Sequence, residues 1–217
     1  MNDPVRPASP DPLFGKRLLF LGSSVTYGSA ANGVSFVDCL AERHGCLCRK
    51  EAVSGTTLCV DDKDSYVSRL FAVDPSVPVD ALLVQLSTND AWMNKPVGTI
   101  AEGFDSASFD PHTVAGAIET ILARAKAVWG CPVVFYTGTR FPSAPYAEMV
   151  ALLGGIQRKW GFTLLDLFYD PEMNAVSPAD YARYMEDPVH PTLEGYREWW
   201  TPKFSACLTD LFFTQTH

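Results

Sequence analysis

A serine near the start of the chain and a histidine near its end have the types and surroundings that nucleophilic catalysis requires. Ser24 follows an apolar run, Leu18 to Leu21, that stops abruptly at a glycine. His190 lies between two prolines and has an aspartate, Asp187, three residues before it. Acyl transfer by a serine needs a base that takes the hydroxyl proton and a carboxylate that orients the base. Taken alone, a serine at this place is more often a helix N-cap than a nucleophile.

The chain contains four histidines, and their neighbours distinguish them. His44 ends a predicted helix, where a cation is favoured for reasons unrelated to chemistry. His112 precedes a predicted helix and has no acidic or nucleophilic motif around it, and His217 is the last residue. Only His190 combines an aspartate three residues before it with a proline on either side. Asp187 can then accept from one ring nitrogen while the other nitrogen faces a serine.

Short apolar runs that end in small polar turns predict buried parallel strands, and amphipathic segments between them predict helices. Strands are expected at residues 18–21, 46–53, 80–86, 132–136 and 162–167, and helices at 33–44, 65–73, 113–129, 146–160 and 192–213. Pro202 should kink or split the last helix. The stretch from Asp170 to Pro191 has no clear period. Strands alternating with helices imply right-handed crossovers and an α/β fold with a parallel sheet covered on both faces.

Polar turns follow three of the predicted strands, at residues 22–24, 54–56 and 87–90. The carboxyl ends of parallel strands meet at one edge of the sheet, where α/β proteins bind their ligands. Residues 91–110 form the longest irregular segment, and long loops in compact domains are often functional. Four large side chains in it are candidates for lining a substrate pocket, although core packing is expected for at least half of them: Trp92, Met93, Phe104 and Phe109.

Four blocks of the sequence resemble the ordered blocks of the SGNH (GDSL-type) hydrolases: residues 20–28, Gly55, 87–90 and 187–191. Each block alone is common, but four in the family order, across nearly the whole chain, are a specific signal. The resemblance implies a three-layer α/β/α sandwich with a five-stranded parallel sheet, a flavodoxin-like arrangement. That number of strands agrees with the five predicted independently from the apolar runs.

The resemblance also implies roles for individual residues. Ser24 matches the nucleophile of the family, His190 matches the base, and Asp187 matches the residue that orients the base. The backbone N–H groups of Ser24 and Gly55 and the side-chain amide of Asn89 match the donors of the oxyanion hole. The expected site therefore draws on three strand ends and on a turn near the end of the chain.

Two positions depart from the family pattern. Ser23 stands where the family usually has aspartate, and Ser87 stands where its third block usually has glycine. Neither change removes a group with a direct chemical role. We expect altered hydrogen bonding in the first turn, and at Ser87 a narrower site or a restrained loop carrying Asn89.

Composition and charge limit the remaining classes of function. The chain has 217 residues, 47% of them hydrophobic and 19% charged, as in ordinary folded domains. Its net charge of −8 disfavours nucleic acid as a partner. No apolar run approaches the ~20 residues of a membrane span, and the N-terminus lacks the features of a signal peptide. We expect a cytoplasmic protein with an extended proline-rich arm at 1–14 and a single hydrolase domain at 15–217.

Six cysteines in a chain without a signal peptide predict free thiols rather than a disulfide framework. Cys46 and Cys48 lack the two-residue spacer of zinc and redox motifs, so core packing is expected for them. With one histidine in the candidate site, no metal and no cofactor is expected. The aromatic residues of 192–213 are expected in the core, with a homodimer interface as the weaker alternative; the oligomeric state stays open.

The residues and the resemblance together predict a serine hydrolase of small carboxylic esters that acts through an acyl-enzyme on Ser24. The expected substrates are small-molecule acetyl or other short-chain acyl esters, including those of carbohydrates. A thioesterase, a lysophospholipase or an acyltransferase on the same triad is the alternative. A non-catalytic module that binds a phosphate-bearing ligand at the turn after Leu21 is a further alternative, because fold alone does not fix function.

Overall fold

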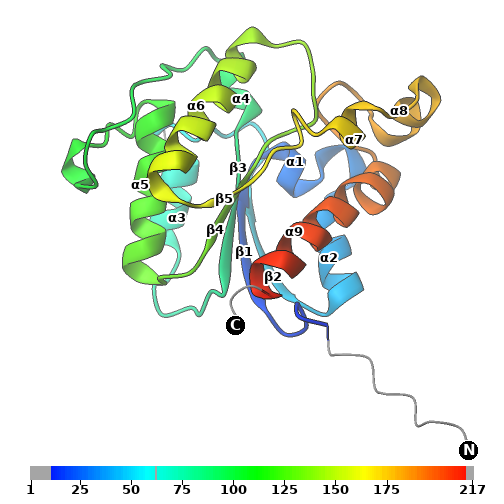
Figure 1. Ribbon diagram of the computed structural model, residues 1–217, viewed down its shortest axis with the longest axis horizontal. Coiled ribbons are helices and arrows are strands. Elements are labelled where there is room, and N and C mark those ends of the chain that lie inside the picture. Colours follow the sequence, from blue (N-terminus) through cyan, green and yellow to red (C-terminus); the bar gives the residue numbers. More distant parts are fainter. Residues whose placement is uncertain (1–10, 62, 214–217) are drawn as a thin grey trace, which may run out of the picture.

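The computed structural model of the protein describes residues 11–61 and 63–213, and its central element is one five-stranded sheet (Figure 1). All neighbouring strands are parallel, in the order β2-β1-β3-β4-β5. The strands are β1 Arg17–Gly22, β2 Leu47–Ala52, β3 Ala81–Gln85, β4 Val133–Tyr136 and β5 Thr163–Leu165. The chain passes from β1 to one neighbour and then back to the other. The carboxyl ends of β1 and β3 therefore form the topological switch point, the usual ligand site of such sheets.

Helices cover both faces of the sheet and give the molecule three layers (Figure 1). Leu19 and Leu21 of β1 point into a core shared with α3, α5 and α6. Leu18 and Phe20 point to the other face, into a core shared with α2, η3 and α9. Because side chains alternate between the two faces and both faces are covered, residues 18–21 of the strand are all apolar. The predicted fold class, an α/β/α sandwich on a five-stranded parallel sheet, is confirmed.

The predicted helices form with ends set by local signals. Ser65, Thr113 and Ser143 accept backbone N–H groups as N-caps, and Gly45 and Gly161 end two helices in the left-handed conformation. The described helices are α1 Ser24–Tyr27, η1 Ser29–Ala31, α2 Phe36–His44, α3 Tyr66–Ala72, α4 Thr88–Trp92, η2 Ser106–Ser108, α5 Val114–Val128, α6 Ala144–Trp160, α7 Pro171–Asn174, α8 Pro178–Tyr184, η3 Gly195–Trp200 and α9 Thr201–Phe213.

The last predicted helix is split as its proline indicates. A π-helical segment, η3, precedes α9, and Pro202 lies in the first turn of α9, where its missing N–H costs least. The aromatic side chains Tyr196, Trp200 and Phe204 are fully buried against the sheet, so core packing is confirmed for them.

The structure differs from expectation in two places, the stretch after Asp170 and the start of the packed domain. The stretch after Asp170 contains the short helices α7 and α8, each with an N-cap followed by proline, a helix-start signature that the missing periodicity obscured. Most of the expected arm, residues 1–10, lies outside the described residues. The part that follows, residues 12–15, forms a turn, and Leu13 is fully buried in the core. The packed domain therefore begins before residue 15.

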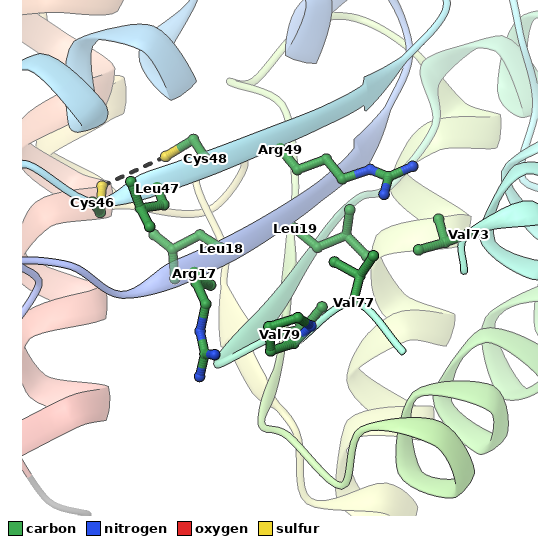
Figure 2. A pocket seen from close by; sticks show the side chains of 11 residues that line it. Arg17, Leu18, Leu19, Cys46, Leu47, Cys48, Arg49, Val73, Val77 and Val79 are labelled. Carbon is green, nitrogen blue, oxygen red and sulfur yellow. Dashed lines mark hydrogen bonds between the residues drawn. The ribbon is translucent and has the colours of Figure 1, made fainter. Parts of the chain in front are cut away.

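The amino end of the sheet holds two of the cysteines beside a cavity of about 430 Å³ (Figure 2). The sulfur atoms of Cys46 and Cys48 lie 3.5 Å apart, while Leu47 between them points to solvent. All six cysteines are free, and Cys46 is buried as predicted. Across residues 11–61 and 63–213 no helix has the length and apolarity to cross a membrane.

Candidate active site

Ser24 is the first residue of α1, directly after the turn that ends β1 (Figure 1). The turn requires glycine at position 22, since a Cβ there would come within 1.7 Å of the Thr26 hydroxyl oxygen. This close approach brings Thr26 to the strand end and starts the helix at once. Ser24 is 8% exposed, so its hydroxyl is enclosed by protein yet open on one side.

The Ser24 hydroxyl lies in a chain of hydrogen bonds with His190 and Asp187. The Nε2 atom of His190 is 2.8 Å from the Oγ of Ser24, and its Nδ1 atom is 2.7 Å from Oδ2 of Asp187. The structure therefore brings Ser24 to His190, which lies 166 positions later in the chain, and so unites the three predicted residues. With Nδ1 protonated, the imidazole can accept the serine proton at Nε2, which is the geometry that a general base needs.

The turn from Asp187 to His190 holds the carboxylate and the ring in register. Oδ1 of Asp187 accepts from the backbone N–H groups of Val189 and His190, at 2.7 and 2.8 Å. Met185 and Pro191 form an antiparallel bridge that closes the turn. Burial works to raise the pKa of Asp187, but the hydrogen bonds from His190 and from these two N–H groups outweigh it and hold that pKa below its usual value. The carboxylate thus stays ionised beside the imidazole.

The two other predicted residues, Gly55 and Asn89, lie on neighbouring loops of the same sheet edge. Gly55 is exposed and has a φ of +82°, a conformation that favours glycine. Asn89 is the second residue of α4, and its side-chain amide donates one hydrogen to the carbonyl of Thr56 at 2.8 Å. This bond ties Asn89 to the loop of Gly55, and the second hydrogen of the amide stays available for a ligand oxygen.

Arg69, which the sequence analysis did not identify as a site residue, connects these loops through hydrogen bonds. Arg69 of α3 is 8% exposed and donates to the carbonyl of Gly22 at 2.7 Å, to the carbonyl of Asp64 at 2.8 Å and to the carbonyl of Glu51. It also donates to the Thr56 hydroxyl at 3.1 Å. Burial lowers the pKa of Arg69. One guanidinium thus links the ends of β1 and β2 to the loop that carries Gly55.

Ser23, which stands where the family has aspartate, is fully buried and held by Gln85 at the end of β3. Oε1 of Gln85 accepts from the Ser23 N–H at 3.0 Å and from the Thr26 hydroxyl at 2.6 Å, and Nε2 donates to the Ser23 hydroxyl at 3.2 Å. The first turn is therefore held by the hydrogen bonds of Gln85 to Ser23 and Thr26. Gln85 is the one polar residue of the apolar strand β3, and this feature of the sequence could have identified it as a residue of the site.

Ser87, the second departure, restrains the loop of Asn89. Its fully buried hydroxyl accepts from the backbone N–H groups of Asn89 and Asp90 and so caps α4. Asp90 adds a second restraint, because its fully buried carboxylate accepts from the N–H groups of Leu58 and Cys59 at 2.7 and 3.1 Å. The loops after β2 and β3 are thereby locked to one another.

A cavity of about 710 Å³ opens beside the imidazole. Its walls come from α4, from the loop before α6 and from the turn of His190, and they include Asn89, Trp92 and Phe141. Of the four large side chains in 91–110, Phe104 and Phe109 instead pack on Trp160. Among the four, only Trp92 lines the cavity and only Phe109 is buried, while Met93 and Phe104 are exposed. The expectation that at least half of them pack in the core is therefore wrong.

No metal centre is found in the described part of the chain, where no three His, Cys, Asp or Glu side chains are grouped to hold an ion. The groups that converge at the sheet edge are a hydroxyl, an imidazole, a carboxylate and an amide. These are the groups of nucleophilic acyl transfer.

Comparison with known proteins was decisive for the family. The family model for GDSL-like lipases and acylhydrolases matches residues 20–198, which include every site residue described above. The chain belongs to this family. No curated protein matched the sequence. As a GDSL-like acylhydrolase, the chain is expected to be a hydrolase, and the four blocks found in the sequence all lie inside the matched range.

Several solved structures share this fold. A protein from Lactobacillus plantarum superposes with a TM-score of 0.74 at 22% identity, covering 93% of this chain and 98% of that one. A candidate GDSL-like lipase from Bacteroides uniformis gives 0.64 at 19% identity, covering 91% and 95%. A possible lipase from Chitinophaga pinensis gives 0.63 at 16% identity, covering 92% and 98%. At these identities the likeness establishes the fold, and the substrate has to be argued from the site.

Proposed function

We propose that the protein is a serine hydrolase that cleaves small carboxylic esters through an acyl-enzyme on Ser24. The Oγ atom of Ser24 attacks the ester carbonyl carbon while its proton passes to Nε2 of His190. The bond from carbon to the alcohol oxygen then breaks, and the imidazolium returns the proton to that oxygen. A water molecule activated by the same imidazole adds to the acyl group, and Ser24 is released with the carboxylic acid.

The negative charge on the carbonyl oxygen is stabilised by three donors in this proposal: the N–H groups of Ser24 and Gly55 and the free hydrogen of the Asn89 amide. Such donors stabilise the transition state because they are fixed in place before the reaction. The bonds of Thr56 to Asn89 and to Arg69 supply that fixity. Asp187 holds the imidazole in the required tautomer.

The single observation that carries the proposal is the continuous chain of hydrogen bonds from Ser24 through His190 to Asp187. A module that only binds phosphate has no need of it. The turn after β1 also offers few free donors to a phosphate, since the N–H groups of Ser23 and Thr26 both donate to Gln85. Short-chain esters of small alcohols, including carbohydrates, are the proposed substrates; thioesters, lysophospholipids and transfer to another acceptor are the alternative on the same residues.

Labelling with a fluorophosphonate tests the proposal directly, because this reagent modifies serines activated by a neighbouring base. We expect modification at Ser24 alone, found by peptide mapping, and none in Ser24→Ala. The variant should keep the circular dichroism spectrum and melting temperature of the wild type while losing ester hydrolysis. A folded wild-type protein that takes up no label, or a Ser24→Ala variant that hydrolyses esters at the wild-type rate, would refute the assignment.

A further inference from the structure

The cavity beside His190 is lined by a tryptophan that is almost fully exposed to solvent. Trp92 is 86% exposed, the highest value among the large apolar side chains of the described residues, and it lines this cavity. Trp92 follows Asn89 by three positions on α4, so the two side chains share one face of the helix. Within residues 11–61 and 63–213 its ring has no aromatic or cationic partner. A large ring held in water beside an oxyanion donor is a surface on which another flat group can stack.

Other lining residues of the cavity are apolar too. Phe141 and Pro142 come from the loop between β4 and α6, and Pro188 and Val189 come from the turn that presents the imidazole. The cavity that Trp92 and these residues line has a volume of about 710 Å³. This volume is large enough for a ring-sized group.

The charges around this cavity favour a neutral occupant. Its ionisable lining residues are Asp187 and His190, and no lysine or arginine is among the described residues that line it. Arg140 precedes Phe141 in the chain but lines two other cavities of this end of the molecule. A phosphate or carboxylate in this cavity would thus lose water and meet the ionised Asp187 without a cation to compensate.

The position beside the imidazole assigns the cavity to one part of the substrate. In the proposed reaction His190 returns its proton to the leaving alcohol oxygen, so the alcohol has to lie on the side of the imidazole. We infer that the cavity binds the alcohol part of the ester, and that this part is an uncharged ring with a flat apolar face that stacks on Trp92. The inference rests on the proposed function and narrows it. It disfavours lysophospholipids, whose leaving group carries a phosphate, and those thioesters whose thiol part carries phosphate.

Two kinds of alcohol share this chemistry, an aromatic ring and the apolar face of a pyranose. The experiment therefore measures kcat and KM for four acetyl esters that differ only in the alcohol: ethyl acetate, benzyl acetate, methyl 6-O-acetylglucoside and 4-(acetoxymethyl)benzoate. The wild type should prefer benzyl acetate to its carboxylate analogue by about tenfold in kcat/KM. Trp92→Ala should lower kcat/KM for the preferred ring ester by about tenfold, mainly through KM, and leave ethyl acetate within about twofold.

The variants and controls separate the outcomes. Trp92→Phe should retain most of the preference because it keeps a ring, whereas Phe14→Ala, at another exposed ring near Gly45, should change nothing. A larger loss with benzyl acetate assigns an aryl alcohol, and a larger loss with the glucoside assigns a sugar. Equal losses on ethyl and ring esters, or equal use of the carboxylate analogue, overturn the inference while the hydrolase stands. If none of the four esters is hydrolysed and Ser24 takes up no label, both proposals fall.

Discussion

Replacing Arg69 tests whether the loops of the site are held by one buried guanidinium. Its four acceptors belong to Gly22, Glu51, Asp64 and Thr56, which lie at the ends of two strands and in the loops beside them. Three of these acceptors are backbone carbonyls and the fourth is a hydroxyl, so Arg69 holds the backbone in place and forms no ion pair through these bonds. We therefore consider Arg69→Met, which keeps an unbranched apolar stem and removes every donor.

The expected loss follows from the burial of these bonds. A hydrogen bond from a charged group contributes roughly 1.5–3 kcal/mol when both partners are enclosed, and less where water can replace the donor. Only the bond to Gly22 is fully buried, while the other three are partly open. The variant also avoids the cost of burying a charged guanidinium, and this offsets part of the loss. We therefore expect the free energy of unfolding to fall by about 2–4 kcal/mol. For a chain of this size that lowers Tm by roughly 5–15 °C.

The effect on catalysis should exceed the effect on binding. Released loops displace Gly55 and Ser24 relative to each other, and a misplacement of ~1 Å in a catalytic group costs up to about 10²-fold. We expect kcat for ethyl acetate to fall about 10- to 100-fold in Arg69→Met, with KM within about threefold, at a temperature well below the Tm of the variant. Arg69→Lys keeps a donor for some of the carbonyls and should recover part of kcat.

A remote arginine provides the control for this experiment. Arg124 of α5 lies over the ring of Phe71, with 4.9 Å between the guanidinium carbon and the ring centre, and touches none of the strand ends. Arg124→Met should leave kcat unchanged. An Arg69→Met protein that is folded, and that turns over at the wild-type rate, would show that the strand ends keep their positions without the guanidinium.

The remaining predictions concern the groups in direct contact with the proposed substrate. Asn89→Ala should lower kcat by ~10² or more with little change in KM, because it removes one oxyanion donor; a change confined to KM would assign Asn89 to binding. Asp187→Asn should cost less activity than His190→Ala, since it disturbs the orientation of the base and leaves the base present; the reverse order would mean that the roles are misassigned. Hydrogen bonds from His190 and from two backbone N–H groups hold the pKa of Asp187 below its usual value, so the carboxylate should stay ionised where an ordinary aspartate begins to take up a proton. An NMR titration of the Asp187 carboxyl should therefore give a pKa below that of an unperturbed aspartate, and a raised pKa would contradict the hydrogen bonding described above.

The sequence by itself determined the elements and their order. Continuous apolar runs such as Leu82 to Val84 can only be buried on both faces, and this predicts a parallel sheet with helices on either side. Local signals also determined where helices end, since a glycine such as Gly45 adopts a left-handed conformation at little cost. The contact between Asp187 and His190 was also predictable from the sequence, because the two residues are only three positions apart.

The tertiary structure decided which residues from distant segments meet. The resemblance to a family named Ser24, Gly55 and Asn89, but only the order of the strands brings their loops to one edge of the sheet. Arg69 had no local signal, because an arginine on a short helix is ordinarily solvated, and its role depends on the strand ends packed around it. Trp92 was one of four candidates for lining a pocket in an irregular segment, and only the fold distinguishes it from the other three, by placing it at the wall of the cavity beside the imidazole. Side-chain contacts over long separations depend on the packing of the whole domain, and periodicity and spacing along the chain do not contain that information.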